Sequence, residues 1–117
     1  LKPLVDIPRM AGLAGGMLAE ALDAFVRRDA ECARRLCARD DEVDTLNRQV
    51  FRELVSFMVE DPATITRAME LILVARNLER VADLATNVAE EVVFIAEARV
   101  IKHHAEEAGQ GGDFGRS

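Results

Sequence analysis

Four acidic residues form two pairs whose members are four positions apart. Asp40 and Asp44 are one pair, and Glu79 and Asp83 are the other. If each pair lies on a helix, its carboxylates sit one turn apart on the same face, where like charges repel by a few tenths of a kcal/mol. Cations such as Mg²⁺, Mn²⁺, Fe or Zn²⁺ relieve that repulsion because they take carboxylate oxygens as ligands. The spacing therefore predicts a metal site if the two pairs face each other.

Spacing alone leaves a second interpretation open, a solvated acidic surface neutralised by nearby Arg48, Arg76 and Arg80. Random placement of 21 acidic residues among 117 gives several such pairs, so their number decides nothing. Their expected positions along the helix axes are more informative. Asp44 lies before the turn near residue 60, and Glu79 lies after it by a similar number of residues, so the two should stand at about the same level on neighbouring helices. On antiparallel helices the four carboxylates then converge.

The second acidic pair lies in a stretch with apolar residues every seven positions. One series is Leu71, Leu78, Ala85 and Val92, and the other is Val74, Val81, Val88 and Ile95. Heptad spacing over this length predicts a long helix packed along neighbouring helices. Asn87 and Glu90 continue the polar stripe of Glu79 and Asp83 on the side away from the apolar residues.

Helix-start signals divide the rest of the chain. Asp6 followed by Pro8 predicts the start of a first helix that ends near residues 27–28, and Asp29 is expected to cap a second helix running to residue 60. Asp61 followed by Pro62 predicts the start of a third helix that ends near Ile101.

The fold class expected from these signals is all-α, an antiparallel three-helix bundle with a long third helix. Residues 1–104 form the bundle, and the glycine-rich residues 105–117 form a flexible C-terminal tail. The second helix is expected to pack through Leu36, Val43, Val50 and Phe57, with Cys32, Leu46 and Leu54 beside them. The first is expected to pack through Leu4, Ala11, Leu18 and Phe25, with Ile7, Ala14 and Ala21 alongside.

Composition narrows the class of function. A formal net charge of −6 argues against a nucleic-acid-binding module, which carries a basic face. Two cysteines, Cys32 and Cys37, do not form a disulfide framework, and no apolar run reaches the length of a membrane span. We therefore expect a cytoplasmic protein without direct membrane insertion.

Gly12, Gly15 and Gly16 either allow close backbone approach or mark a flexible entry to the first helix.

Enzyme sites lack their parts in this sequence. There is no Glu-x-x-His motif for a di-iron site, and His103 and His104 lie near the expected end of the third helix rather than in its middle. No Ser/His/Asp set or phosphate-binding glycine loop is present, so we expect no catalytic residues. The cluster of arginines between Arg27 and Arg39 is interpreted as a solvated helix end, and a patch that binds an acidic protein surface or phosphate is the open alternative.

The chain resembles the PhoU family of phosphate-uptake regulators. The segment R-N-L-E-R-V-A-D-L-A-T-N-V-A-E-E-V-V-F, residues 76–94, is similar to the family's signature helix, and D-D-E-V-D, residues 40–44, is similar to the helix before it. Family members usually contain two tandem three-helix repeats. Because this chain resembles the second, we expect a first repeat to lie outside it.

The resemblance implies several properties. Asp40, Asp44, Glu79 and Asp83 match the family's metal motif, which implies one or several Fe, Zn, Mn or Mg ions. Leu84 stands where relatives often have a His, so an outer-shell role of that His is not expected. The family implies a negative regulator of the phosphate-starvation response, linking the ATPase subunit of the phosphate ABC transporter to a sensor histidine kinase.

Two other functions remain open at this point. The first is a metal-free helical interaction or dimerisation module in which the carboxylates only keep the surface soluble. The second, and weaker, is a metal-dependent phosphohydrolase. Because one repeat supplies only half of the family's surface, we also expect the chain to pair with itself as a homodimer and so rebuild a six-helix arrangement.

Overall fold

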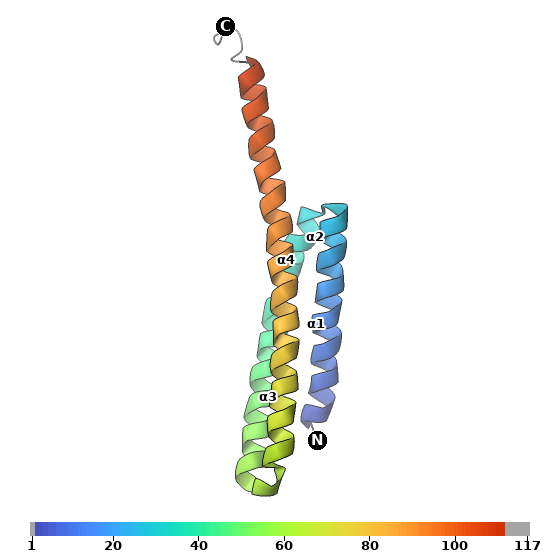
Figure 1. Cartoon of the computed structure of the whole chain (residues 1–117), viewed down its shortest axis with the longest axis vertical. Coiled ribbons are helices and arrows are strands. Elements are labelled where there is room, and N and C mark those ends of the chain that lie inside the picture. The colour runs from blue at the N-terminus through green and yellow to red at the C-terminus, as the bar shows by residue number, and fades with distance from the viewer. Residues whose placement is uncertain (1, 112–117) are drawn as a thin grey trace.

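The structure is a computed structural model that describes residues 2–111, with side chains described for residues 5–109. In this part of the chain all regular structure is helical: α1 (Lys2–Arg27), α2 (Ala30–Cys37), α3 (Asp40–Glu60), the 3₁₀ turn η1 (Pro62–Thr64) and α4 (Ile65–Gly111). The chain runs up through α1, down through α2 and α3, and up through α4, as Figure 1 shows. The expected all-α, antiparallel three-helix arrangement is confirmed, in a rod measuring 80 × 21 × 17 Å.

The expected second helix is divided into two, which corrects the prediction of one continuous helix from Asp29 to residue 60. Asp29 does cap α2, because its Oδ1 accepts a hydrogen bond from the backbone N–H of Cys32 at 3.0 Å. After Cys37 the N–H of Arg39 bonds to the carbonyl of Leu36, three residues back, at 3.0 Å. This tighter turn ends α2 without a glycine or a proline, so α3 begins anew at Asp40.

The first helix begins before the predicted start, since α1 already includes Lys2 and Pro8 lies inside it. Proline removes one hydrogen bond and costs about 3 kcal/mol within a helix. Ile7 and Met10, on either side of Pro8, are buried in the core. Their burial favours the helical path through Pro8.

The third predicted helix starts where expected and ends later. Asp61 caps η1 by accepting a hydrogen bond from the N–H of Ala63 at 3.1 Å, and α4 follows directly. The predicted end near Ile101 was wrong, because α4 continues to Gly111. Residues 105–108 are Ala-Glu-Glu-Ala, all strong helix formers, and His103 pairs with Glu107 at 2.9 Å. Residues 112–117 of the predicted tail lie outside the described residues.

The core is richer in alanine than the predicted heptad series. Val43, Leu46, Val50 and Leu54 of α3 are buried as expected. On α4, however, Val74 and Ile95 are exposed, and the buried apolar residues are Ala68, Ala75, Ala82, Ala85, Ala89 and Val92. On α1, Ala11 and Phe25 are exposed, and the buried apolar residues are Ile7, Met10, Ala14, Met17, Ala21 and Ala24. Small alanine side chains let the helix axes approach closely. The faces of α1 and α4 that pack in the core are therefore the alanine-rich ones, which differ from the faces that heptad counting predicted.

The C-terminal part of α4 projects beyond the ends of α1 and α2 (Figure 1). Every residue from Glu97 to Ala108 is exposed. Within residues 2–111, no helix combines the length and the apolar character that crossing a membrane requires.

Candidate metal centre

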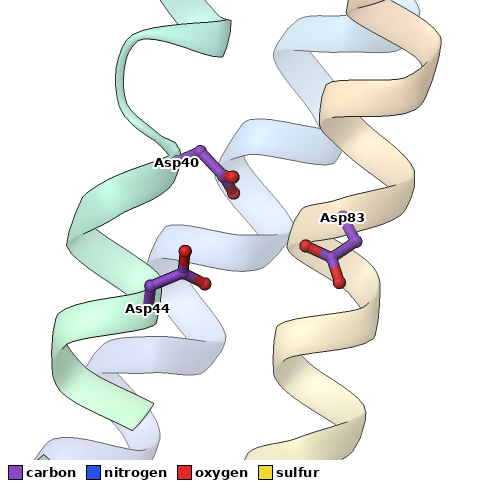
Figure 2. Close-up of side chains that lie close together, drawn as sticks. All are labelled: Asp40, Asp44 and Asp83. Atoms are coloured by element: carbon purple, nitrogen blue, oxygen red, sulfur yellow. The ribbon is translucent and has the colours of Figure 1, made fainter. Parts of the chain in front are cut away.

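Three of the four predicted metal ligands meet between α3 and α4. One carboxylate oxygen from each of Asp40, Asp44 and Asp83 lies within 4.8 Å of the others. Figure 2 shows Asp40 and Asp44 on consecutive turns of α3, with Asp83 facing them from α4. Asp40 and Asp44 are half-buried and Asp83 is exposed, so the group opens to solvent. We call these three residues the acidic cluster.

The break between α2 and α3 positions Asp40. Arg39, within the break, pairs with Glu20 of α1 at 2.8 Å, which ties the start of α3 to the first helix. Asp40 is consequently the first residue of α3 and is followed by Asp41 and Glu42 in the same turn. Carboxylates are favoured near a helix N-terminus, where unpaired backbone N–H groups carry partial positive charge.

Glu79, the fourth predicted ligand, lies beside the acidic cluster and not within the set of three. Its Oε2 accepts a hydrogen bond from Nδ2 of Asn47 on α3 at 3.2 Å. Partial burial, followed by the charges of Asp44 and Asp83 and a hydrogen bond with Asp44, raises the pKa of Glu79. The structure therefore brings Glu79 close enough to interact with two members of the cluster.

The cluster is electrostatically unfavourable without a cation. Burial first, and then the charges of Asp44 and Asp83, raise the pKa of Asp40. Oδ1 of Asp40 is buried and has no hydrogen-bond partner in the described part of the chain. Buried polar atoms without partners cost about 1–3 kcal/mol each, so a cation, a water molecule or a proton at this oxygen would be stabilising.

The alternative of arginine neutralisation does not match the observed ion pairs. Among the described side chains, the arginine pairs join Arg27 to Asp23 and Asp29, Arg34 to Glu31, and Arg39 to Glu20. None of these pairs involves the acidic cluster or Glu79, so Arg48, Arg76 and Arg80 form no ion pair with these four carboxylates.

Two neighbouring residues were not singled out for the site by sequence reasoning. Burial, followed by the charges of Glu90 and Asp40, raises the pKa of the Cys37 thiol, which keeps it protonated at neutral pH. The hydroxyl of Thr86, in a buried residue, donates to the carbonyl oxygen of Asp83 at 2.9 Å. Cys37 is only three residues before Asp40, across the break between α2 and α3, and this short separation could have indicated its proximity.

The donor set fits a cation that prefers oxygen. Three carboxylates with a fourth beside them supply several oxygen ligands, and the protonated thiol of Cys37 does not compete. Mg²⁺ and Mn²⁺ favour such ligands, and Fe and Zn²⁺ accept them. Asp40, Asp44 and Asp83 would hold the ion, whose charge would offset the repulsion among them.

The fold and the site define the class of protein as an elongated all-helical bundle with carboxylates gathered between two of its helices. Within that class the family is shown by sequence. Residues 7–92 match the family model described as the PhoU domain, and the chain belongs to the PhoU family.

Individual relatives agree with this assignment. A phosphate-specific transport system accessory protein PhoU homolog of Caulobacter vibrioides is 44% identical over 89 residues, covering 76% of this chain and 39% of the relative. The homolog of Aquifex aeolicus is 40% identical over 111 residues, covering 94% and 50%. That of Pseudomonas aeruginosa is 37% identical over 99 residues, covering 85% and 41%. The chain thus spans half or less of the length of these relatives.

Proposed function

We propose that the chain is a regulatory adaptor of phosphate uptake. Membership of the PhoU family supports a role in phosphate transport, because the relatives carry the name of a phosphate-specific transport system accessory protein. The region that matches the family model, residues 7–92, includes all three residues of the acidic cluster.

The proposal extends to partners and location. The chain contacts the ATPase subunit of the phosphate ABC transporter and a sensor histidine kinase, both in the cytoplasm, and restrains the phosphate-starvation response when phosphate is plentiful. The long exposed faces of a rod offer separate surfaces for two partners. An adaptor of this kind needs no catalytic residues.

One observation carries the metal part of the proposal: three carboxylates from two helices converge, and no arginine among the described side chains forms an ion pair with them. A cation held by Asp40, Asp44 and Asp83 links α3 to α4. Its remaining coordination positions can bind phosphate or a carboxylate of a partner protein. Glu79 adds a negative charge next to Asp44 and Asp83. It would be a ligand of a second ion if the site holds more than one.

The test uses protein purified without chelators. Elemental analysis is expected to find Fe, Zn, Mn or Mg, and after chelation the same metal is expected to raise the melting temperature, because a ligand that binds only the native state stabilises it. Asp44→Asn with Asp83→Asn removes two ligands and is expected to abolish the metal-dependent rise. Glu70→Gln with Glu91→Gln changes the charge equally at exposed positions outside the cluster and is the matched control.

A metal-free interaction module is the alternative, and it is favoured by the exposed Phe94 and Ile101 on α4. Purified protein without bound metal would support this alternative, provided that the Asp44→Asn, Asp83→Asn variant also binds the transporter ATPase as well as the wild type does. Loss of metal together with loss of ATPase binding in that variant supports the metal-dependent adaptor.

A further inference from the structure

A cavity of about 380 Å³ lies where the C-terminal end of α1 meets the side of α4. Figure 1 shows this region, in which α4 continues past the end of α1. The cavity is separate from the acidic cluster, which lies between α3 and α4. Binding sites for small molecules are usually hollows of about 300–1,000 Å³, so this cavity is large enough to hold a ligand.

The wall of the cavity is mostly apolar. Phe25 and Val26 of α1 and Val92 and Ile95 of α4 contribute to it. Val92 is buried, whereas Phe25 is 50% exposed and Ile95 is 37% exposed. An aliphatic ligand lying against these side chains would remove apolar surface from water, which favours binding.

The charged residues of the cavity are both basic. Arg28, directly after α1, and Arg99 of α4 line it, and no acidic residue does. The chain as a whole carries a formal net charge of −6, so this is a local positive site on an acidic protein. The neighbouring cavity beside α2 is different, because it is lined by Arg34 together with Glu90 and Glu97.

Both arginines of the cavity are available to a ligand. Within the arginine cluster between Arg27 and Arg39, ion pairs engage Arg27, Arg34 and Arg39. Among the described side chains, neither Arg28 nor Arg99 forms an ion pair or a side-chain hydrogen bond. An anion in the cavity would therefore not have to displace a carboxylate of the protein.

The backbone of Arg28 is strained. Its φ of 58° lies in the left-handed region, where glycine is usual at the end of a helix. The N–H of Arg28 bonds to the carbonyl of Phe25 at 3.3 Å, and that of Asp29 bonds to the carbonyl of Ala24 at 2.9 Å. Glycine would form the same two bonds without strain, so the arginine side chain is not needed to end α1. A strained residue that lines a cavity points to a role in binding.

We propose that this cavity binds a fatty-acid-like anion, with an aliphatic chain against the apolar wall and a carboxylate paired with Arg28 and Arg99. Guanidinium groups suit this head group because each can donate two parallel hydrogen bonds to a carboxylate. The size of the hollow favours a single small molecule over a protein partner, since stable protein interfaces bury about 800 Å² on each side. A recessed site also favours a single molecule over a flat bilayer.

The first experiment measures binding to the chelated 117-residue chain by isothermal titration calorimetry, with each ligand below its micelle concentration. Decanoate is expected to bind with a dissociation constant in the high micromolar range. Acetate, which lacks the chain, is expected not to bind measurably. Decyltrimethylammonium has the same chain with the opposite charge and is expected to bind at least about 10-fold more weakly. Unspecific adsorption would favour this cation instead, because the protein is acidic.

Arginine variants test the head-group contact. Arg28→Gly and Arg99→Gln are each expected to weaken decanoate binding about 10-fold or more, because each removes a hydrogen bond between charged groups. Arg28→Gly is also expected to raise the melting temperature by a few degrees, because it relieves the backbone strain. A change that stabilises the fold and weakens binding separates a ligand contact from a structural role.

The matched control for the double variant Arg28→Gly, Arg99→Gln is Arg35→Gln with Arg67→Gln. Arg35 and Arg67 are exposed and do not line the cavity, so this pair changes the net charge equally. Decanoate affinity of the control is expected to stay within about 2-fold of the wild type, since exposed charges at a distance are screened by salt.

Methyl NMR locates the bound chain. Decanoate is expected to shift the methyl resonances of Val26, Val92 and Ile95 and to leave that of Val50, in the core of α3, unchanged. Sedimentation with vesicles of phosphatidylglycerol tests the bilayer as the source of the same chemistry. The chain is expected to remain in the supernatant.

Each outcome decides the proposal. Decanoate binding that is localised by NMR and lost in the Arg28→Gly, Arg99→Gln variant, but kept in the control, supports it. The proposal is overturned if decanoate does not bind, if the cation binds as tightly, or if the control loses as much affinity. Arginine-dependent sedimentation with vesicles overturns it in favour of a membrane surface. Because the protein is chelated throughout, these results leave the proposed regulatory function and its metal site untouched.

Discussion

Asn47 on α3 donates a hydrogen bond to Glu79 on α4 across 3.2 Å and so joins the two helices beside the acidic cluster. Asn47→Asp removes this donor and adds a further carboxylate. In metal-free protein the substitution is expected to lower the free energy of unfolding by about 2 kcal/mol, because one hydrogen bond is lost and another repulsion is added.

Urea unfolding of the chelated protein measures this change. Asn47→Ala removes only the hydrogen bond and is expected to cost about 1 kcal/mol. Addition of metal is expected to restore stability to Asn47→Asp and not to Asn47→Ala. Equal costs for the two substitutions, with no difference in response to metal, would contradict the assignment of an unneutralised acidic site.

The raised pKa of Asp40 predicts a pH-dependent stability in the metal-free protein. A carboxyl whose pKa is higher in the folded state than its ordinary 3.8 binds its proton more tightly when folded. The resulting stabilisation is complete below pH 3.8 and is lost as the pH rises through the folded pKa. Ionised Asp40 therefore destabilises the fold at neutral pH.

Asp40→Asn is expected to raise the free energy of unfolding at neutral pH by about 1 kcal/mol in chelated protein, since it removes a repelled charge. The gain should shrink as the pH falls toward 3.8. Urea titrations at several pH values give the curve, with the exposed neighbour Asp41→Asn as control. A loss of stability at neutral pH would refute the explanation.

The glycines of α1 are expected to be replaceable. A Cβ added at Gly12, Gly15 or Gly16 meets nothing within 4 Å, and none of these glycines has a positive φ. Each substitution by alanine should therefore raise the free energy of unfolding by about 0.5–1 kcal/mol, through the lower chain entropy of the unfolded state. Thermal unfolding of the single and triple variants measures the gain. A loss at any of the three positions would show that its backbone is needed for close contact.

The alanine core predicts where larger side chains are not tolerated. Ala82 is 1% exposed, and Ala82→Leu is expected to lower the free energy of unfolding by about 1–3 kcal/mol because the helices must separate. Val74, which heptad counting assigned to the packed face, is 45% exposed, and Val74→Ala should change stability by less than about 1 kcal/mol. Chemical denaturation measures the free energy of unfolding of both variants. A larger loss for Val74→Ala than for Ala82→Leu would show that Val74 lies on the packed face, as heptad counting predicted.

Much of the fold could be predicted from the sequence because its signals are local. Asp29 and Asp61 cap helices as expected, and heptad spacing indicated helices throughout. The packed faces of α1 and α4 were harder to predict, since alanine occurs on several sides of each helix and its apolar signal is weak. The break after Cys37 arises from backbone bonding and a distant partner, Glu20, so no local residue type indicates it.

The position of the site could also be predicted in part. Counting residues from the turn at Asp61 indicated that the two acidic pairs lie at similar heights, and the structure brings Asp40, Asp44 and Asp83 together. The displaced position of Glu79 depends on its hydrogen bond to Asn47, which residue counting does not predict. Metal binding by these residues stays a prediction.

Helix α4 runs without interruption from Ile65 to Gly111 and therefore passes both the acidic cluster and the projecting end. Eighteen residues separate Asp83 from Ile101, which corresponds to about 27 Å of straight helix. A rigid helix of this length fixes the geometry between its two ends: a ligand or partner bound at the acidic cluster is held at a set distance and angle from one bound at the projecting end. Inserting two residues between them would turn the far end by about 200° and lengthen the rod by only about 3 Å, which separates the effect of angle from that of reach.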